Sequence, residues 1–163
     1  AEVGMTHDPR SVANKILDIA DKSGKQLTIM QLLKLVYLAN GWWLSFKNEP
    51  FTKTEAQAWQ YGPVHPEVYN AFKGSGNSVI RTRATSKATG LEYRDEFAPD
   101  EVDMLKAVVD SYGDHHAFAL SNIMHRPGTP WTLTVERDGL YRPIPNSLVK
   151  EHFDELRRSR SAA

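Results

Sequence analysis

The sequence predicts a mainly α-helical fold, in which a single compact helical domain carries a small β element or hairpin. Apolar residues recur every three or four positions along most of the chain, which is the spacing of one helix face. Proline or a capping residue begins several of these runs, and only one short stretch alternates as a strand does. A chain of 163 residues suffices for one domain with one core.

The first two helices have the clearest signals. An Asp-Pro pair followed by apolar residues at helical spacing predicts a helix over residues 9–22. Thr28 and Gln31 have the spacing of a capping box and predict a second helix that continues to about Phe46. The apolar residues of that helix cover more than one stripe, which indicates a helix buried in the middle of the domain.

The other elements have weaker signals. Weak alternation predicts an extended element within residues 53–61, and Pro66 begins a short helix that ends at a Gly-rich turn. The polar stretch over residues 78–97 suits a surface hairpin or a mobile loop. Further helices are predicted over residues 99–112 and 117–124, after residues 129–131, and from about residue 146 onward.

Three regions are expected along the chain. Residues 1–4, ahead of Met5, have the character of a cloning remnant, and residues 5–156 form the helical domain. Residues 157–163 carry three arginines and are expected to be a basic flexible tail.

Composition limits the classes of function. The chain has no cysteine, which excludes disulfides and thiolate nucleophiles. Its formal net charge is +0, so no general positive field attracts nucleic acid, and we expect no nucleic-acid partner. No signal segment or spanning apolar run is visible, so we expect a cytoplasmic protein with no membrane partner. No cofactor motif is present, and none is expected to be bound.

Two alternatives remain open at this stage. His115, His116 and His125, with a carboxylate, would form the centre of a metal-dependent hydrolase, although their spacing matches no metal motif and no metal residues are assigned. The second helix resembles part of a helix-turn-helix, which would make the chain an autoregulatory DNA-binding protein. Its N-terminal end offers only Gln31 and Lys34 for reading bases.

The aromatic residues suggest contact with another protein. Trp42 and Trp43 are adjacent and are not expected to face the same core, so Trp43, close to Lys47, is a candidate for an exposed contact. Trp59 is expected in the core.

The stretch "AWQYGPVHPEVYNAFKG" contains two backbone bends, at Gly62-Pro63 and at His65-Pro66. A bent aromatic loop of this kind braces the second helix, or it presents Tyr61, His65 and Tyr69 to a partner. The structural role and the contact role both stay open.

Four stretches carry a family resemblance: "KLVYLANGWWL", "EAQAWQYGPVHPEVYNAFK", "LSNIMHRPGTPW" and "IPNSLVKEHF". In this order and spacing the chain resembles the Panacea antitoxin domain family, which includes phage-associated GepA-like proteins and SocA-like antitoxins. The resemblance implies a bacterial antitoxin that neutralises a cognate protein toxin by direct contact, without enzymatic activity. For SocA-like members it also implies an adaptor that delivers the toxin to the ClpXP protease, with ClpX as a further partner.

Two sets of residues follow. The motif residues with an expected structural role are Tyr37, Trp59, Gly62, Pro63, Pro66 and Trp131. The candidates for partner binding are Trp43, Tyr61, His65, Tyr69, Arg157 and Arg158.

Overall fold

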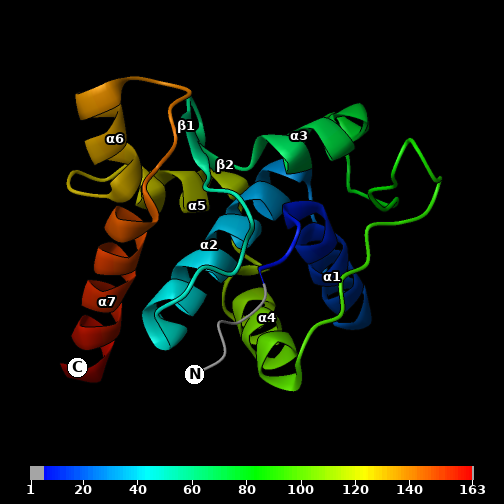
Figure 1. Cartoon of the computed structure of the whole chain (residues 1–163), viewed down its shortest axis with the longest axis horizontal. Helices are drawn as coiled ribbons and strands as arrows, with labels where there is room; N and C mark the ends of the chain where they lie inside the picture. The colour runs from blue at the N-terminus through cyan, green and yellow to red at the C-terminus, as the bar shows by residue number, and fades with distance from the viewer. Residues whose placement is uncertain (1–5, 163) are drawn as a thin grey trace.

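The helix α2 (Ile29–Lys47) is the element around which most of the other helices pack in this computed structural model (Figure 1). The structure describes residues 6–162, apart from the side chains of residues 118, 161 and 162. Helices dominate and one small antiparallel sheet accompanies them, which confirms the predicted mainly α class. The expected remnant at residues 1–4 lies outside the described residues.

The predicted N-caps are confirmed. The carboxylate of Asp8 accepts a hydrogen bond from the backbone N–H of Arg10 at 2.9 Å and begins α1 (Pro9–Lys22). The capping box predicted at Thr28 and Gln31 forms at the start of α2. Both helices therefore begin where local backbone donors gain side-chain acceptors.

The small sheet is a hairpin. β1 (Gln57–Trp59) pairs antiparallel with β2 (Gly62–Val64), which places Gln60 and Tyr61 in the connecting loop. The segment after α6 extends this sheet, because the N–H of Tyr141 donates to Ala58 O at 2.7 Å. The extended element predicted within residues 53–61 is thereby confirmed.

The segment that follows the hairpin packs against α1. α3 (Pro66–Phe72) passes into a short 3-10 helix, Lys73–Ser75. The stretch predicted as a hairpin or mobile loop holds one antiparallel bridge, between Thr85 and Glu92. The side chain of Asn14 bonds the backbone of this stretch on both sides of the bridge, so α1 anchors it.

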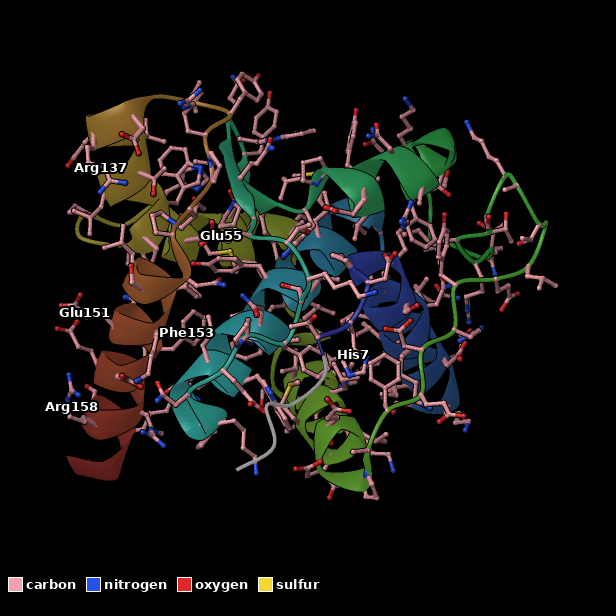
Figure 2. All side chains as sticks on the ribbon, viewed as in Figure 1. His7, Glu55, Arg137, Glu151, Phe153 and Arg158 are labelled. Atoms are coloured by element: carbon pink, nitrogen blue, oxygen red, sulfur yellow. The ribbon has the colours of Figure 1, made fainter. Side chains whose placement is uncertain are left out.

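The remaining helices lie as predicted: α4 (Pro99–Tyr112), α5 (Ala117–Met124), α6 (Pro130–Asp138) and α7 (Asn146–Ala162). α7 packs more extensively on α2 than any other element does. Gly41 makes this close approach possible, since the ring of Phe153 fills the space where any other residue would place a Cβ. In Figure 2, Phe153 points from α7 toward α2, whereas Glu151 and Arg158 point away.

The helix α7 continues to Ala162, through residues expected to form a basic flexible tail, and Arg157 and Arg160 pack over aromatic rings of α2. The structure corrects one expectation. Trp42 and Trp43 are both buried, at 6% exposure each, although one was expected near the surface. Since α2 is enclosed on several sides, Trp42 packs on α7 and Trp43 packs on Phe51.

Candidate functional site

Aromatic side chains gather at the hairpin in what we call the aromatic tip: Trp59, Tyr61, Tyr69 and Tyr141. The ring of Trp59 stands edge-on to Tyr69 and to Tyr141, with centroids 5.1 and 5.8 Å apart. Tyr61 is 63% exposed and Tyr141 is 58% exposed, while Trp59 and Tyr69 are half-buried. The tip is thus an exposed aromatic surface on a packed base.

The helices α5 and α6 hold the hairpin loop in place. The indole N–H of Trp131 donates to Trp59 O at 2.7 Å, and the hydroxyl of Ser121 donates to Tyr61 O at 3.0 Å. The Nε2 atom of His125 lies 3.2 Å from Gln60 O. Consecutive carbonyl oxygens of the loop therefore have partners, which fixes the backbone that carries Tyr61.

Tyr141 has an unusual backbone conformation. Its φ is 66°, in the left-handed region that bulky residues rarely adopt. The N–H of Tyr141 and the carbonyl of its neighbour Arg142 both bond Ala58, so pairing with β1 stabilises this conformation. The strained backbone turns the Tyr141 ring outward beside Trp59.

Lys34 lies under the hairpin. Its side chain comes from the middle of α2, is 0% exposed, and its Nζ atom has no hydrogen-bond partner among the described residues. Burial lowers the pKa of the Lys34 amine to about 8. Gly62 lies directly above it, with φ of 121°, and a Cβ there would come within 2.9 Å of Lys34 Cε.

His65 is not on the surface, which corrects its expected outward position. The side chain is 0% exposed, and its Nε2 atom lies 3.4 Å from Thr52 Oγ1. Burial lowers the pKa of His65 to about 4, so the imidazole is neutral at physiological pH. Gly62 and Pro63 are also buried, and Pro66 begins α3 at the domain edge.

A groove lies at the far end of α2 from the hairpin, and we call it the aromatic groove. Its volume is about 780 Å³, and it lies between α2, α4 and α7. Its lining comprises Trp42, Trp43, Phe46, Lys47, Asp100, Asp103, Met104, Ala107, Val108, Ser111, Tyr112, Arg157 and Arg160.

Arginines from α7 cover the aromatic rings of the aromatic groove. The Cζ atom of Arg157 is 5.1 Å from the ring centroid of Phe46, and that of Arg160 is 4.8 Å from Trp42. Arg160 also donates to the hydroxyl of Tyr112 at 3.0 Å. Arg158 is exposed on the outer side of α7, away from the groove (Figure 2).

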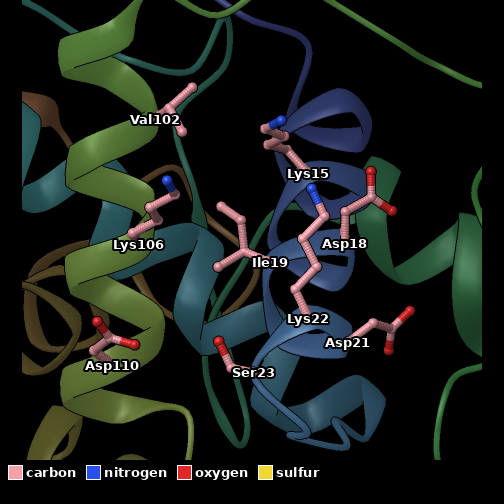
Figure 3. A pocket seen from close by; sticks show the side chains of 9 residues that line it. All are labelled: Lys15, Asp18, Ile19, Asp21, Lys22, Ser23, Val102, Lys106 and Asp110. Carbon is pink, nitrogen blue, oxygen red and sulfur yellow. The ribbon is translucent and has the colours of Figure 1, made fainter.

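A second hollow of about 530 Å³ lies between α1 and α4 (Figure 3). Its rim alternates in sign, with Lys15, Lys22 and Lys106 against aspartates. Asp18 and Asp21 already form ion pairs with Arg83, at 2.9 Å for Asp18. Two acidic groups of this hollow are therefore already paired within the fold.

The two alternative functions find no support in the placement of their residues. The described residues contain no group of three His, Asp or Glu side chains able to hold a metal ion. His125 contacts the hairpin loop, whereas His115 lies against Tyr112. The helix-turn-helix idea is wrong, because α2 is enclosed and Lys34 is buried inside the domain.

Sequence reasoning missed three residues. Phe46, not Trp43, is the exposed aromatic of α2, at 57% exposure. Tyr141 follows Gly139 and Leu140 in a turn, and no local sequence pattern predicts that it pairs with β1. Lys34 lies among leucines in a helix that is apolar on several sides, and these apolar neighbours could have predicted its burial.

None of the helices within residues 6–162 is long and apolar enough to cross a membrane. Residues 32–132 match the family model described as Antitoxin SocA-like, Panacea domain. The chain is 32% identical to Antitoxin SocA of Caulobacter vibrioides (strain NA1000 / CB15N), over 91% of this chain and 86% of that protein. No solved structure matches significantly. The chain therefore belongs to the SocA-like antitoxin family, characterised by the Panacea domain.

Proposed function

We propose that this protein is the antitoxin of a type II-like toxin–antitoxin pair and that it neutralises a cognate protein toxin by binding it through the aromatic tip. Membership of the antitoxin family carries the first part of the proposal. The exposure of Tyr61 and Tyr141 on a braced hairpin supports the second.

The composition and rigidity of the aromatic tip suit a protein interface. Tyrosine and tryptophan are enriched among the residues that contribute most to binding. Because Ser121, His125 and Trp131 already fix the loop, little conformational entropy is lost when a partner binds. These supporting residues, together with β1 and β2, lie within the segment that matches the family model.

We further propose that the protein acts in the cytoplasm and without turnover, as a stoichiometric inhibitor. Its family is one of antitoxins, and the tip offers aromatic contact area. Ser121 Oγ lies 3.1 Å from His125 Nδ1, the spacing of a hydroxyl beside a base, but both side chains hold the hairpin loop. His125 is engaged by the hairpin loop and Ser121 donates to Tyr61 O.

Co-expression with a toxin tests the proposal. A toxin is first identified as a protein that arrests growth and is tolerated when this chain is present. Tyr61→Ser combined with Tyr141→Asn should abolish the rescue while the melting temperature stays within a few degrees, because both side chains are exposed. Asn tolerates the left-handed backbone at position 141.

Leu91→Ser is the matched control, since Leu91 is 70% exposed in the segment between α3 and α4, outside the tip. The control should rescue growth fully. Full rescue by the double tyrosine variant would remove the tip from the proposal, and failure of the unmodified chain to neutralise any toxin would remove the antitoxin role.

The finer role that we propose is delivery of the bound toxin to ClpXP. Resemblance to SocA-like antitoxins supports it, and so does the exposed basic end of α7, where Arg158 faces away from the domain. Tethering a toxin near the unfoldase raises its effective concentration there. Arg158→Glu should slow degradation of the toxin and leave toxin binding intact.

Purified components give the measurement. The toxin should be degraded faster by ClpXP when this chain is added, and the chain itself should persist. Equal degradation with and without the chain would contradict the adaptor role and leave simple neutralisation.

A further inference from the structure

We propose that the aromatic groove is the interface of a symmetric dimer, in which a second copy of this chain covers it. This inference is independent of the proposed function, because the aromatic tip lies on another part of the surface.

The groove exposes apolar surface on its floor. Phe46 is 57% exposed, and Ala107 of α4 is exposed beside it. Trp42 and Trp43 form the base beneath and are nearly fully buried. A hollow of about 780 Å³ with a projecting phenyl ring is a surface that a packed partner would cover.

The two walls of the groove carry opposite charges. The α7 wall presents Arg157 and Arg160, and the α4 wall presents Asp100 and Asp103. Lys47 pairs with Asp100 at 3.4 Å, which leaves Asp103 with no ion pair to the described residues. Arg160 likewise forms no ion pair with a carboxylate in the described part of the chain, although it bonds Tyr112.

This arrangement is complementary to itself. A two-fold axis that lies in the interface, parallel to α2, exchanges the two walls, so the α7 wall of one copy faces the α4 wall of the other. The positive wall of each copy then meets the negative wall of its partner across the groove. Isologous interfaces need this kind of self-complementarity.

Other occupants fit the groove less well. A small ligand is held by a few convergent polar groups, yet the buried polar atoms without partners in the described structure belong to Lys34, His65, Glu67 and Thr134, none of which lines the groove. The α7 wall lies outside residues 32–132, the segment that carries the family match. A toxin that binds in the groove is therefore a separate outcome of the test.

Sedimentation velocity over a range of concentrations tests the dimer. The unmodified chain should sediment as a dimer at micromolar concentration and dissociate as salt rises. The pair Arg157→Glu and Arg160→Glu makes both walls acidic, and the pair Asp100→Lys and Asp103→Lys makes both walls basic. Each double variant alone should dimerise at least about 100-fold more weakly, since like charges then face each other.

Mixing the two double variants is the decisive step. An acidic groove and a basic groove complement each other at both walls, so the mixture should form a heterodimer as stable as the original dimer. Arg158→Glu is the control, because Arg158 lies outside the groove and its charge change should leave the dimer intact. Circular dichroism confirms that each variant is folded.

Two outcomes would overturn the inference: an unmodified chain that stays monomeric at about 100 μM, where interfaces of modest affinity are populated, or a dimer unaffected by both double variants. If the unmodified chain is monomeric and the groove variants also lose toxin neutralisation, the groove binds toxin instead. If the dimer forms and the groove variants still neutralise toxin, both proposals stand separately.

Discussion

The ammonium group of Lys34 is enclosed by the domain without a hydrogen-bond partner among the described residues. Removing a charge from water without a counter-charge is costly, and the lowered pKa, about 8, reflects that cost. Because the unfolded chain binds the proton more tightly than the folded one, folding stability should rise with pH between about 8 and the ordinary lysine pKa of 10.5.

Lys34→Met should therefore stabilise the domain at pH 7, by up to about 3 kcal/mol, the free energy that corresponds to the pKa difference. The gain should shrink as pH rises above 8, since the native amine then loses its charge. Urea unfolding at about pH 7, about pH 8.5 and about pH 9.5 measures both the gain at neutral pH and its loss at higher pH. Lys87→Met is the control, because Lys87 is exposed. A Met variant less stable than the original at pH 7 would show that the ammonium has a favourable partner.

His65 gives the opposite end of the pH range. Burial lowers its pKa to about 4 from the ordinary histidine value of 6.5, so the unfolded chain binds more protons than the folded chain between these pH values. Stability should fall as pH drops from 6.5 toward 4, with a contribution from His65 of up to about 3 kcal/mol. His65→Gln should flatten the dependence of unfolding free energy on pH in that window. An unchanged slope in the variant would contradict the buried neutral histidine.

At the scale of elements, the contact between α2 and α7 depends on one glycine. A Cβ at Gly41 would overlap the ring of Phe153, so Gly41→Ala should force the helices apart and destabilise the domain by about 1–3 kcal/mol. This cost should exceed the better helix propensity of alanine, about 0.5–1 kcal/mol. Chemical denaturation compares it with Gly74→Ala, where no atom lies within 4 Å of the added Cβ. Adding Phe153→Leu to the Gly41 variant should restore part of the loss, and a neutral Gly41→Ala would show that the helices shift freely.

Caps and apolar spacing in the sequence predicted most helices and strands, but they did not predict the contacts between these elements. Caps at Asp8 and Thr28 and apolar spacing located the helices, since these features act within one helical turn. The burial of His65 and the extension of α7 depend on contacts with distant residues, such as Thr52 and Trp42. The candidate site was predictable in part: Tyr61 is exposed as expected, whereas Tyr141 joins the tip only through pairing with β1.

At the scale of the molecule, two surfaces occupy different parts of the domain. The hairpin lies near the start of α7 (Figure 1). The aromatic groove is lined by Arg157 and Arg160, near the end of the same helix. We infer a division of labour in which the aromatic tip binds toxin while the groove binds a second copy. Because the two surfaces do not overlap, covering the groove leaves the aromatic tip accessible. A dimer would therefore present two aromatic tips to toxin.

The most direct test of the central claim is a titration of toxin activity with the purified chain, in the absence of any protease. If neutralisation occurs by binding, toxin activity should fall linearly and reach zero at about one chain per toxin, with the slope set by stoichiometry. The chain should be recoverable unchanged in a complex with the toxin. Complete and lasting inactivation by a small fraction of an equivalent would mean that the chain acts catalytically, and would contradict the account.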